Sequence, residues 1–527
     1  MLKFKTLLPG ISSASIILIV LGAALFALCQ AAIESNDFNI YFDSYLLHVI
    51  GITVFQAVLS TILSILLALL MAKALSMVDF FCKHLLLRLM PITFILPSLV
   101  VVTGLLSIYG QQGVLASILK YFGISFSGWS IYGLKGILLA HVFLNFPYAC
   151  RLFYQTLSLV PVEHKRLAAQ LNFSSITYFK LIEWPLLRCQ LFPMAALIFM
   201  LCFSSFAIVL ALGGGPKYTT IEVAIYQSIR EFELLQAVLF AGIQLICCIS
   251  FLWLTQKILH KNKDNQNVTI DFNKQNYHLS VSNYLKFFSA VIILVGGLFI
   301  FLPLINIVIE GSRFFDLSLL NTAFKQATLF SLLIALGAAM IAIVLALLIL
   351  WTNSRLIINH QIKWSNQLML VGSLILAIPS MVLSSGLFLL LFKYADNRVF
   401  ICILMMLCNA LMALPFVLKN LAIPMYEVTL RYWQLSQSLN INGFRHFYIV
   451  EYKALKKIII MSFAFSGILS LGDFGIIALF GGQSVTTLPY YLYEQISHYH
   501  YHESMVTAAV LLTLSFSLLI VMDYDRT

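Results

Sequence analysis

The feature that most constrains the fold is a series of about twelve long apolar runs. Each comes close to the roughly 20 mostly apolar residues that an α-helix needs to cross a lipid bilayer. Hydrophobic residues make up 61% of the 527 positions and charged residues only 10%, so the apolar excess must face lipid. The sequence therefore predicts an all-α membrane protein with spans at 7–29, 47–75, 89–109, 134–158, 190–212, 236–258, 284–309, 325–351, 367–393, 399–418, 456–480 and 504–522.

The positions of the charged residues predict how these spans are oriented. The net charge of +11 would suggest nucleic-acid binding in a soluble protein. With the N-terminus placed in the cytoplasm, however, most of the 32 Lys and Arg residues, such as Lys73 and Arg355, fall in cytoplasmic loops. An excess of basic residues in cytoplasmic loops is the known signal of membrane topology. We therefore expect a lipid environment, both termini in the cytoplasm, and no nucleic-acid partner.

The chain also repeats itself on the two sides of a polar stretch at 257–284. Six predicted spans separate equivalent positions, so the two copies face the same way. Such parallel repeats are related by an axis along the membrane normal and can form the two walls of one path. A shift of 282 positions pairs Pro97-Ser98 with Pro379-Ser380, and a later shift of 268 pairs Pro147 with Pro415, Asn172 with Asn440, Glu183 with Glu451, and Phe206 with Phe474.

This repeat divides the chain into two copies and their accessory segments. Residues 1–46 hold the first helix and an outer loop, and residues 47–258 form the first copy. Residues 259–283 are a cytoplasmic linker, residues 284–324 hold the seventh helix and its outer loop, and residues 325–522 form the second copy.

The cytoplasmic segment after the fourth span of each copy carries the clearest functional pattern. In the first copy, Leu167, Leu171, Phe179 and Ile182 are spaced as on short amphipathic helices, away from Lys165 and its basic neighbours. Such helices present an apolar face to a partner.

This segment resembles the coupling loop of binding-protein-dependent ABC importers, whose type I transmembrane domains dock on a separate ATPase. The family motif is Glu-Ala-Ala, a Gly after three more residues, and a Pro thirteen residues past the Gly. An Asn at the glycine position keeps the left-handed backbone that the motif needs, since Asn tolerates it best after Gly. The matching site is Arg166-Leu167-Ala168, Leu171, Asn172, Glu183 and Pro185 in the first copy, and Gln434-Leu435-Ser436, Leu439, Asn440, Glu451 and Lys453 in the second.

The resemblance implies that ATP is bound and hydrolysed by a partner ATPase subunit, expected to be a homodimer. The chain itself contains no GxxxxGK[ST] phosphate-binding loop. We therefore expect no catalytic residues and no cofactor in this chain. We also expect no metal site, since His498, His500 and His502 alternate with tyrosines typical of a membrane interface.

Stretches in both copies look like the permeases of bacterial thiamine importers over nearly the whole chain. They include residues 107–113, 132–141, 213–216, 219–222, 409–413, 472–475 and 487–493. The resemblance implies an inner-membrane permease that moves thiamine and its phosphate esters from periplasm to cytoplasm, supplied by a periplasmic thiamine-binding protein. Two alternatives are a fused permease for ferric iron or another small solute, and a major-facilitator carrier, whose basic turn after the second helix is missing at 76–83.

Three polar residues in predicted spans are candidates for the translocation path. Asp473 lies near the outer end of a span, where it either attracts a cationic thiazolium ring or caps a backbone broken by glycines. His141 and Asn145 lie four residues apart on one helix face. They could line the path, but such groups more often hold helices together by hydrogen bonds.

The repeated acids Glu183 and Glu451 are expected to fix the coupling segments where the chain re-enters the membrane. The nearby basic residues Arg188, Lys456 and Lys457 are the predicted partners, with solvation at the surface as the alternative.

Overall fold

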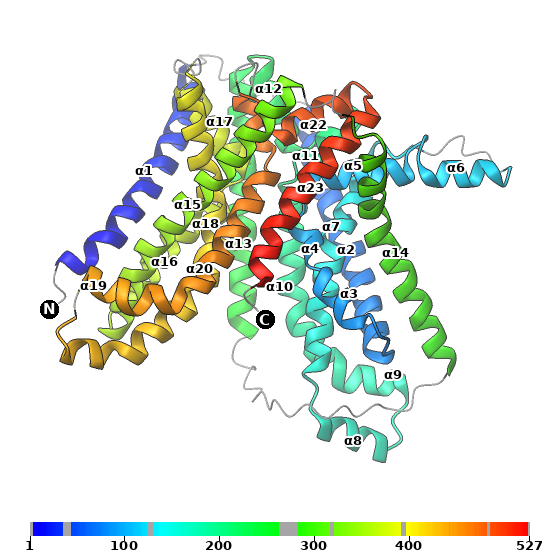
Figure 1. Cartoon of the computed structure of the whole chain (residues 1–527), viewed down its shortest axis with the longest axis horizontal. Coiled ribbons are helices and arrows are strands. Elements are labelled where there is room, and N and C mark those ends of the chain that lie inside the picture. The colour runs from blue at the N-terminus through cyan, green and yellow to red at the C-terminus, as the bar shows by residue number, and fades with distance from the viewer. Residues whose placement is uncertain are drawn as a thin grey trace.

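The computed structural model describes residues 4–34, 44–123, 130–262, 283–316, 321–391, 397–441, 443–481 and 485–524. All the elements in these residues are helices (Figure 1). The first half contains α1 (Phe4–Glu34), α2 (Ser44–Met77), α3 (Lys83–Leu89), α4 (Ile92–Ile95), α5 (Ser98–Tyr109), α6 (Val114–Tyr121), α7 (Leu134–Ser158), α8 (Val162–Gln170), α9 (Ser175–Tyr178), α10 (Trp184–Phe203), α11 (Ala207–Leu212), α12 (Ile221–Arg230) and α13 (Leu234–Asn262). The second half contains α14 (Asn283–Arg313), α15 (Thr322–Ile358), α16 (Ile362–Ser373), α17 (Ser380–Leu391), α18 (Arg398–Ser438), α19 (Phe444–His446), α20 (Lys453–Gly472), α21 (Gly475–Phe480), α22 (Leu488–Ser497) and α23 (Tyr501–Tyr524).

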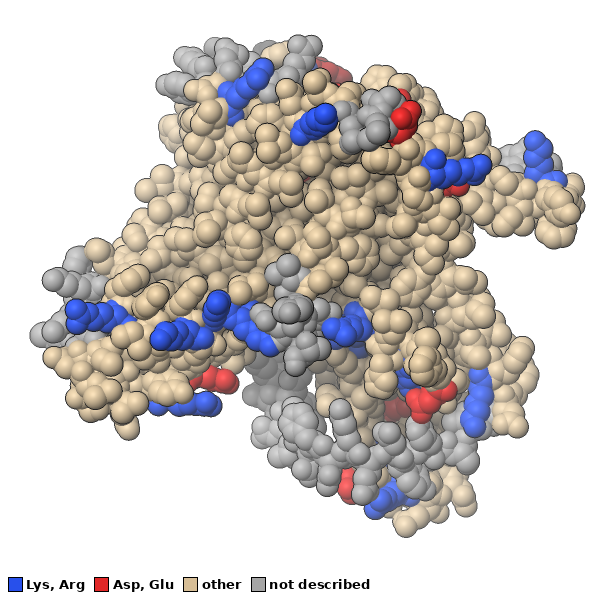
Figure 2. All heavy atoms as spheres, viewed as in Figure 1, with Lys and Arg blue, Asp and Glu red and all other residues tan. Residues whose placement is uncertain are grey.

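The predicted all-helical membrane fold is confirmed. In the described part of the chain, 11 helices are long and apolar enough to cross a bilayer, and a bent pair, Ile362–Leu376 with Ser380–Leu391, would make 12. Figure 2 shows most Lys and Arg side chains near the two ends of the molecule, with a largely uncharged surface between them. Most of the predicted linker, 263–282, lies outside the described residues, and α13 continues to Asn262.

The third and ninth spans are broken, although the sequence predicted continuous helices at 89–109 and 367–393. The third divides into α3, α4 and α5, and the ninth bends by 85° between its two parts. A proline stands at each break: Pro97 directly precedes α5, and Pro379 directly precedes α17. Proline lacks an N–H and pushes the residue before it to an extended backbone, as seen at Leu96 and Ile378, so the helix cannot continue through it.

The fifth and eleventh spans are also discontinuous, which corrects the predicted runs 190–212 and 456–480. In the first half α10 ends at Phe203 and α11 begins at Ala207. In the second half α20 ends at Gly472 and α21 begins at Gly475. The two breaks therefore fall at equivalent positions of the repeat.

The tenth span is much longer than the predicted 399–418. Its helix α18 includes Pro415 and Pro424 and continues to Ser438, since neighbouring helices can accommodate proline inside a membrane helix. In the first half the equivalent helix α7 ends at Ser158, and Pro161 then caps the separate helix α8. Thr429 stands where Pro161 stands in the first copy, and it has the backbone N–H that a continuous helix needs.

The first helix of each half packs against the other half. Helix α1 meets α15, where Gly10 N donates to Thr352 Oγ1 at 2.9 Å, and α17, where Gly386 leaves no room for a Cβ next to Ala24. Helix α14 in turn meets α5 at Gly104, the repeat equivalent of Gly386. This exchange joins the two halves.

Candidate functional site

The coupling segments of the two halves lie at the same end of the molecule. Figure 1 shows α8, α9 and α19 at this end, and α12 and α22 at the opposite one. In the first half Pro161 directly precedes α8, and the Ser174 side chain caps α9 by accepting a hydrogen bond from Thr177 N. In the second half the end of α18 takes the place of α8, and α19 follows Gly443, which has a φ of 64°.

The asparagine at the glycine position of each motif adopts the predicted left-handed backbone. Asn172 has a φ of 50° and Asn440 a φ of 52°. The following backbone N–H closes the turn in both copies, from Phe173 to Ala168 O and from Ile441 to Ser436 O, at 2.9 Å each. Both halves therefore build the same turn without a glycine.

An apolar face on each coupling segment is exposed. Leu167 and Leu435, equivalent residues of the repeat, are 54% and 57% exposed, and Leu171 and Leu439 are exposed as well. Arg166, Gln434 and Pro185 lie at or near the surface beside them, whereas Ala168 and Ser436 are buried at the third motif position and anchor each turn. Partial burial also lowers the pKa of the Lys165 ammonium, an effect that the Glu183 carboxylate opposes.

An ion pair with a buried carboxylate ties each coupling segment to the membrane helices. In the first half Lys73 Nζ of α2 lies 2.5 Å from Glu183 Oε2. In the second half Arg355 Nη2 of α15 lies 3.1 Å from Glu451 Oε1. Lys73 and Arg355 are themselves equivalent under the 282-residue shift, so the repeat conserves the whole pair, with both acids on a π-helical turn that precedes α10 or α20.

The predicted partners of these acids, Arg188, Lys456 and Lys457, are therefore wrong, and so is the surface-solvation alternative. Glu183 is 5% exposed and Glu451 is fully buried. Glu451 Oε1 also accepts from Thr429 Oγ1 at 3.1 Å and lies 3.2 Å from His446 Nδ1. A carboxylate turned into the protein cannot reach basic side chains on its own helix surface, and the helix that faces it supplies the cation instead.

Two of the polar candidates for the path, His141 and Asn145, lie between helices of the first half. His141 Nδ1 is 3.0 Å from Ser60 Oγ on α2. Asn145 Nδ2 donates to His141 O at 2.8 Å and contacts Cys202 Sγ on α10 at 3.6 Å. Both side chains are buried, and these contacts join helices of one half, which is the helix-holding role described for such groups.

The third candidate, Asp473, occupies the break between α20 and α21. Its Oδ2 accepts a hydrogen bond from Ile476 N at 3.1 Å, so it caps the short helix α21. The carboxyl group also lines a small pocket with Ser331, Asn409 and Thr487. The geometry therefore matches the backbone-capping alternative.

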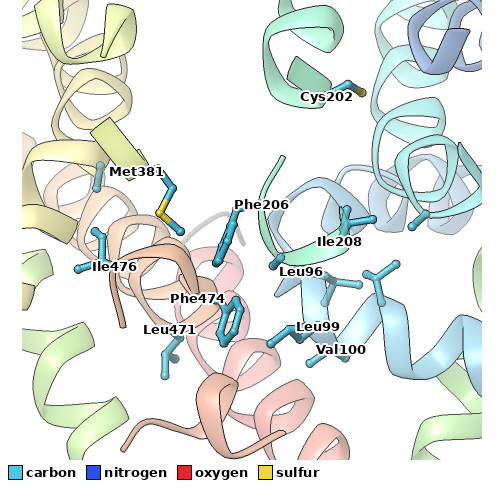
Figure 3. Packing of buried hydrophobic residues seen from close by; sticks show 14 of the residues in the cluster. Leu96, Leu99, Val100, Cys202, Phe206, Ile208, Met381, Leu471, Phe474 and Ile476 are labelled. Atoms are coloured by element: carbon cyan, nitrogen blue, oxygen red, sulfur yellow. The ribbon is translucent and has the colours of Figure 1, made fainter. Parts of the chain in front are cut away.

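Two phenylalanines that entered the sequence argument only as a repeat match form a contact between the two halves. The rings of Phe206 and Phe474 stack with their centroids 5.5 Å apart and their planes 15° apart (Figure 3). Each phenylalanine sits in the break of its own span. A contact between equivalent residues of two related halves must lie beside the axis that relates them.

The described residues contain no group of three or more His, Cys, Asp or Glu side chains placed to hold a metal ion. The site therefore consists of two surface segments at one end of the molecule, an ion pair behind each of them, and a ring contact between the two halves. The signal that could have located the basic partners in the sequence is the 282-residue shift, which relates Lys73 to Arg355.

Comparisons with known proteins agree with this geometry. Residues 64–264 match the family of binding-protein-dependent transport system inner membrane components. The thiamine transport system permease protein of Salmonella typhimurium is 41% identical over 97% of this chain and 95% of its own length. Those of Escherichia coli and Haemophilus influenzae are 40% and 42% identical, over 98% and 96% of this chain and 96% and 93% of their own lengths.

Proposed function

The chain belongs to the family of thiamine transport system permease proteins, and from this membership we propose that it is the membrane-spanning subunit of an ATP-driven thiamine importer. It moves thiamine and its phosphate esters from the periplasm to the cytoplasm along the axis between its two halves. The relatives do not favour the two alternatives, a permease for ferric iron or another solute and a major-facilitator carrier.

The observation that carries the proposal is the pair of coupling segments. Two equivalent surface turns, each with a left-handed asparagine and an exposed leucine, lie at one end of a chain that lacks a phosphate-binding loop. An apolar knob of this kind fits a groove on a partner. ATP-driven movement of the partner would reach the membrane helices through the ion pairs behind the turns.

A binding-protein-dependent permease works with an ATPase and a binding protein. Because the two turns share one backbone geometry, the ATPase is proposed to be a homodimer with one docking groove per turn. The permease itself is then not an enzyme and binds no cofactor. The periplasmic partner, a thiamine-binding protein, would deliver the substrate at the end that carries α12 and α22.

The chain is a multi-pass protein of the bacterial inner membrane, which its family and its apolar helices support. We place the coupling segments and both termini on the cytoplasmic side. The excess of Lys and Arg in the loops at that side supports this orientation.

Deleting the gene from cells that have no second thiamine importer is expected to abolish uptake of labelled thiamine at low external concentration. Returning the gene on a plasmid should restore it, and uptake through an unrelated ATP-driven importer serves as the control. Unchanged thiamine uptake in the deletion strain would refute the ligand while leaving the importer class untouched.

A further inference from the structure

The phenylalanine contact on the axis is the centre of a larger array of aromatic rings. Phe206 also packs against Tyr226 of α12, with ring centroids 5.3 Å apart. Phe474 packs against Tyr493 of α22 at 4.9 Å. Tyr226 and Tyr493 occupy the same position in equivalent helices, so the four rings form a symmetric row, Tyr226–Phe206–Phe474–Tyr493, across the boundary between the halves. We call it the aromatic row.

In this structure the aromatic row closes the axis. Phe206 is 5% and Phe474 2% exposed. Solute that moves between two parallel repeats must pass along this boundary. In secondary transporters, which are also built from repeats, substrate sites typically lie where discontinuous membrane helices meet at the repeat interface. Both phenylalanines lie in such discontinuities, between α10 and α11 and between α20 and α21.

A cation already lies against the aromatic row. The Arg230 guanidinium carbon is 5.4 Å from the centre of the Tyr226 ring. Its Nη2 donates to Ala478 O, on the other half, at 3.0 Å. The faces of aromatic rings attract cations. The contact with Arg230 shows that the aromatic row accommodates a planar cationic group at the boundary between the halves.

We propose that the aromatic row is a binding site for the aromatic cation in the translocation path, exposed when Phe206 and Phe474 separate. This inference rests on the proposed function, because it takes thiamine as the substrate. Thiamine combines a permanently cationic thiazolium ring with an aminopyrimidine, and both planar rings can stack on aromatic faces. The two halves would then offer the substrate equivalent ring faces, and the site closes again when the phenylalanines stack.

The test is equilibrium binding of labelled thiamine to the purified permease–ATPase complex in lipid nanodiscs, with and without a non-hydrolysed ATP analogue. The double variant F206L/F474L removes the central rings and keeps apolar side chains of similar size. We expect it to weaken thiamine binding about tenfold, as the loss of two cation–ring contacts implies. The ATPase subunit should still co-purify with this variant, which shows that the complex is assembled.

Two further variants separate ring chemistry from packing. Y226F/Y493F keeps both outer rings and should bind like the wild type, whereas Y226L/Y493L should lose affinity. The matched control F199L removes a partly buried ring that packs on Phe203 and Phe251, both in the first half, and should bind normally.

Equal binding by F206L/F474L and wild type would overturn the site, as would equal losses in Y226F/Y493F and Y226L/Y493L. Absence of thiamine binding in every nucleotide state would also overturn it. None of these results touches the proposed function, which fails only if uptake survives deletion of the gene.

Discussion

Glu451→Ala is expected to destabilise the protein by about 3–5 kcal/mol, because it leaves the Arg355 guanidinium buried without its carboxylate. Arg355 is 4% exposed and Glu451 fully buried, so water cannot replace the lost partner. The arginine would keep three uncharged contacts: its hydrogen bond to Trp351 O, its place over the Trp351 ring, and Nη2 at 3.3 Å from His446 Nδ1. Thermal unfolding of the purified protein in detergent measures the loss, and ATP-driven thiamine uptake should fall with it.

The repeat supplies a control for this prediction. In Glu183→Ala the orphaned cation is Lys73, whose side chain is 23% exposed and can turn toward water, so we expect a loss of only about 1 kcal/mol. Replacing both charges of the buried pair, as in R355M/E451M, should recover most of the stability, since similar-sized apolar residues often replace a buried pair well. Equal losses in Glu451→Ala and Glu183→Ala would contradict this account of the two pairs.

The double substitution L167D/L435D is expected to abolish co-purification of the ATPase and to reduce uptake at least about 100-fold, because two buried leucine contacts are lost. Burying a leucine stabilises a contact by roughly 1.5–3 kcal/mol, and each aspartate adds a charge that would have to be desolvated in the groove. Both leucines are more than half exposed. The unfolding temperature of the isolated permease should therefore hardly change.

Phe232→Asp is the matched control for that variant. Phe232 is 76% exposed, lies between α12 and α13 at the opposite end, and has a φ of 62°, which aspartate tolerates better than phenylalanine. It should leave ATPase binding unchanged. If L167D/L435D still retained the ATPase, the exposed leucines would not be the docking face.

The sequence predicts best what depends on local composition. The membrane helices follow from apolar runs, and the left-handed turns at Asn172 and Asn440 follow from one residue in a repeated motif. The breaks at Pro97 and Pro379 carry a local signal too. Spans identified from mean hydropathy miss this signal, because the average does not depend on where a proline interrupts the helix.

The packing between distant segments could not be predicted in the same way. Lys73 and Glu183 are 110 residues apart, and Arg355 and Glu451 are 96 apart, so only the folded bundle brings them together. Nearby Arg188 looked a better partner because it is close in sequence, yet burial of the acid turns its carboxylate toward α2. Likewise, the 268-residue shift shows that Phe206 and Phe474 are equivalent, but it does not show where the axis between the halves lies. The stacking of the two rings therefore could not be predicted from the sequence.

The most direct test of the central claim is the side of the membrane on which the coupling turns lie. Single cysteines at Gln170 and Ser438, exposed and equivalent in the repeat, would be introduced into a variant without native cysteines. A membrane-impermeant maleimide should label both in inverted vesicles but not in intact spheroplasts, and bound ATPase should block the labelling, whereas Glu231→Cys at the opposite end should react only from outside. Labelling of Gln170→Cys or Ser438→Cys in intact spheroplasts would contradict a permease driven through these turns by a cytoplasmic ATPase.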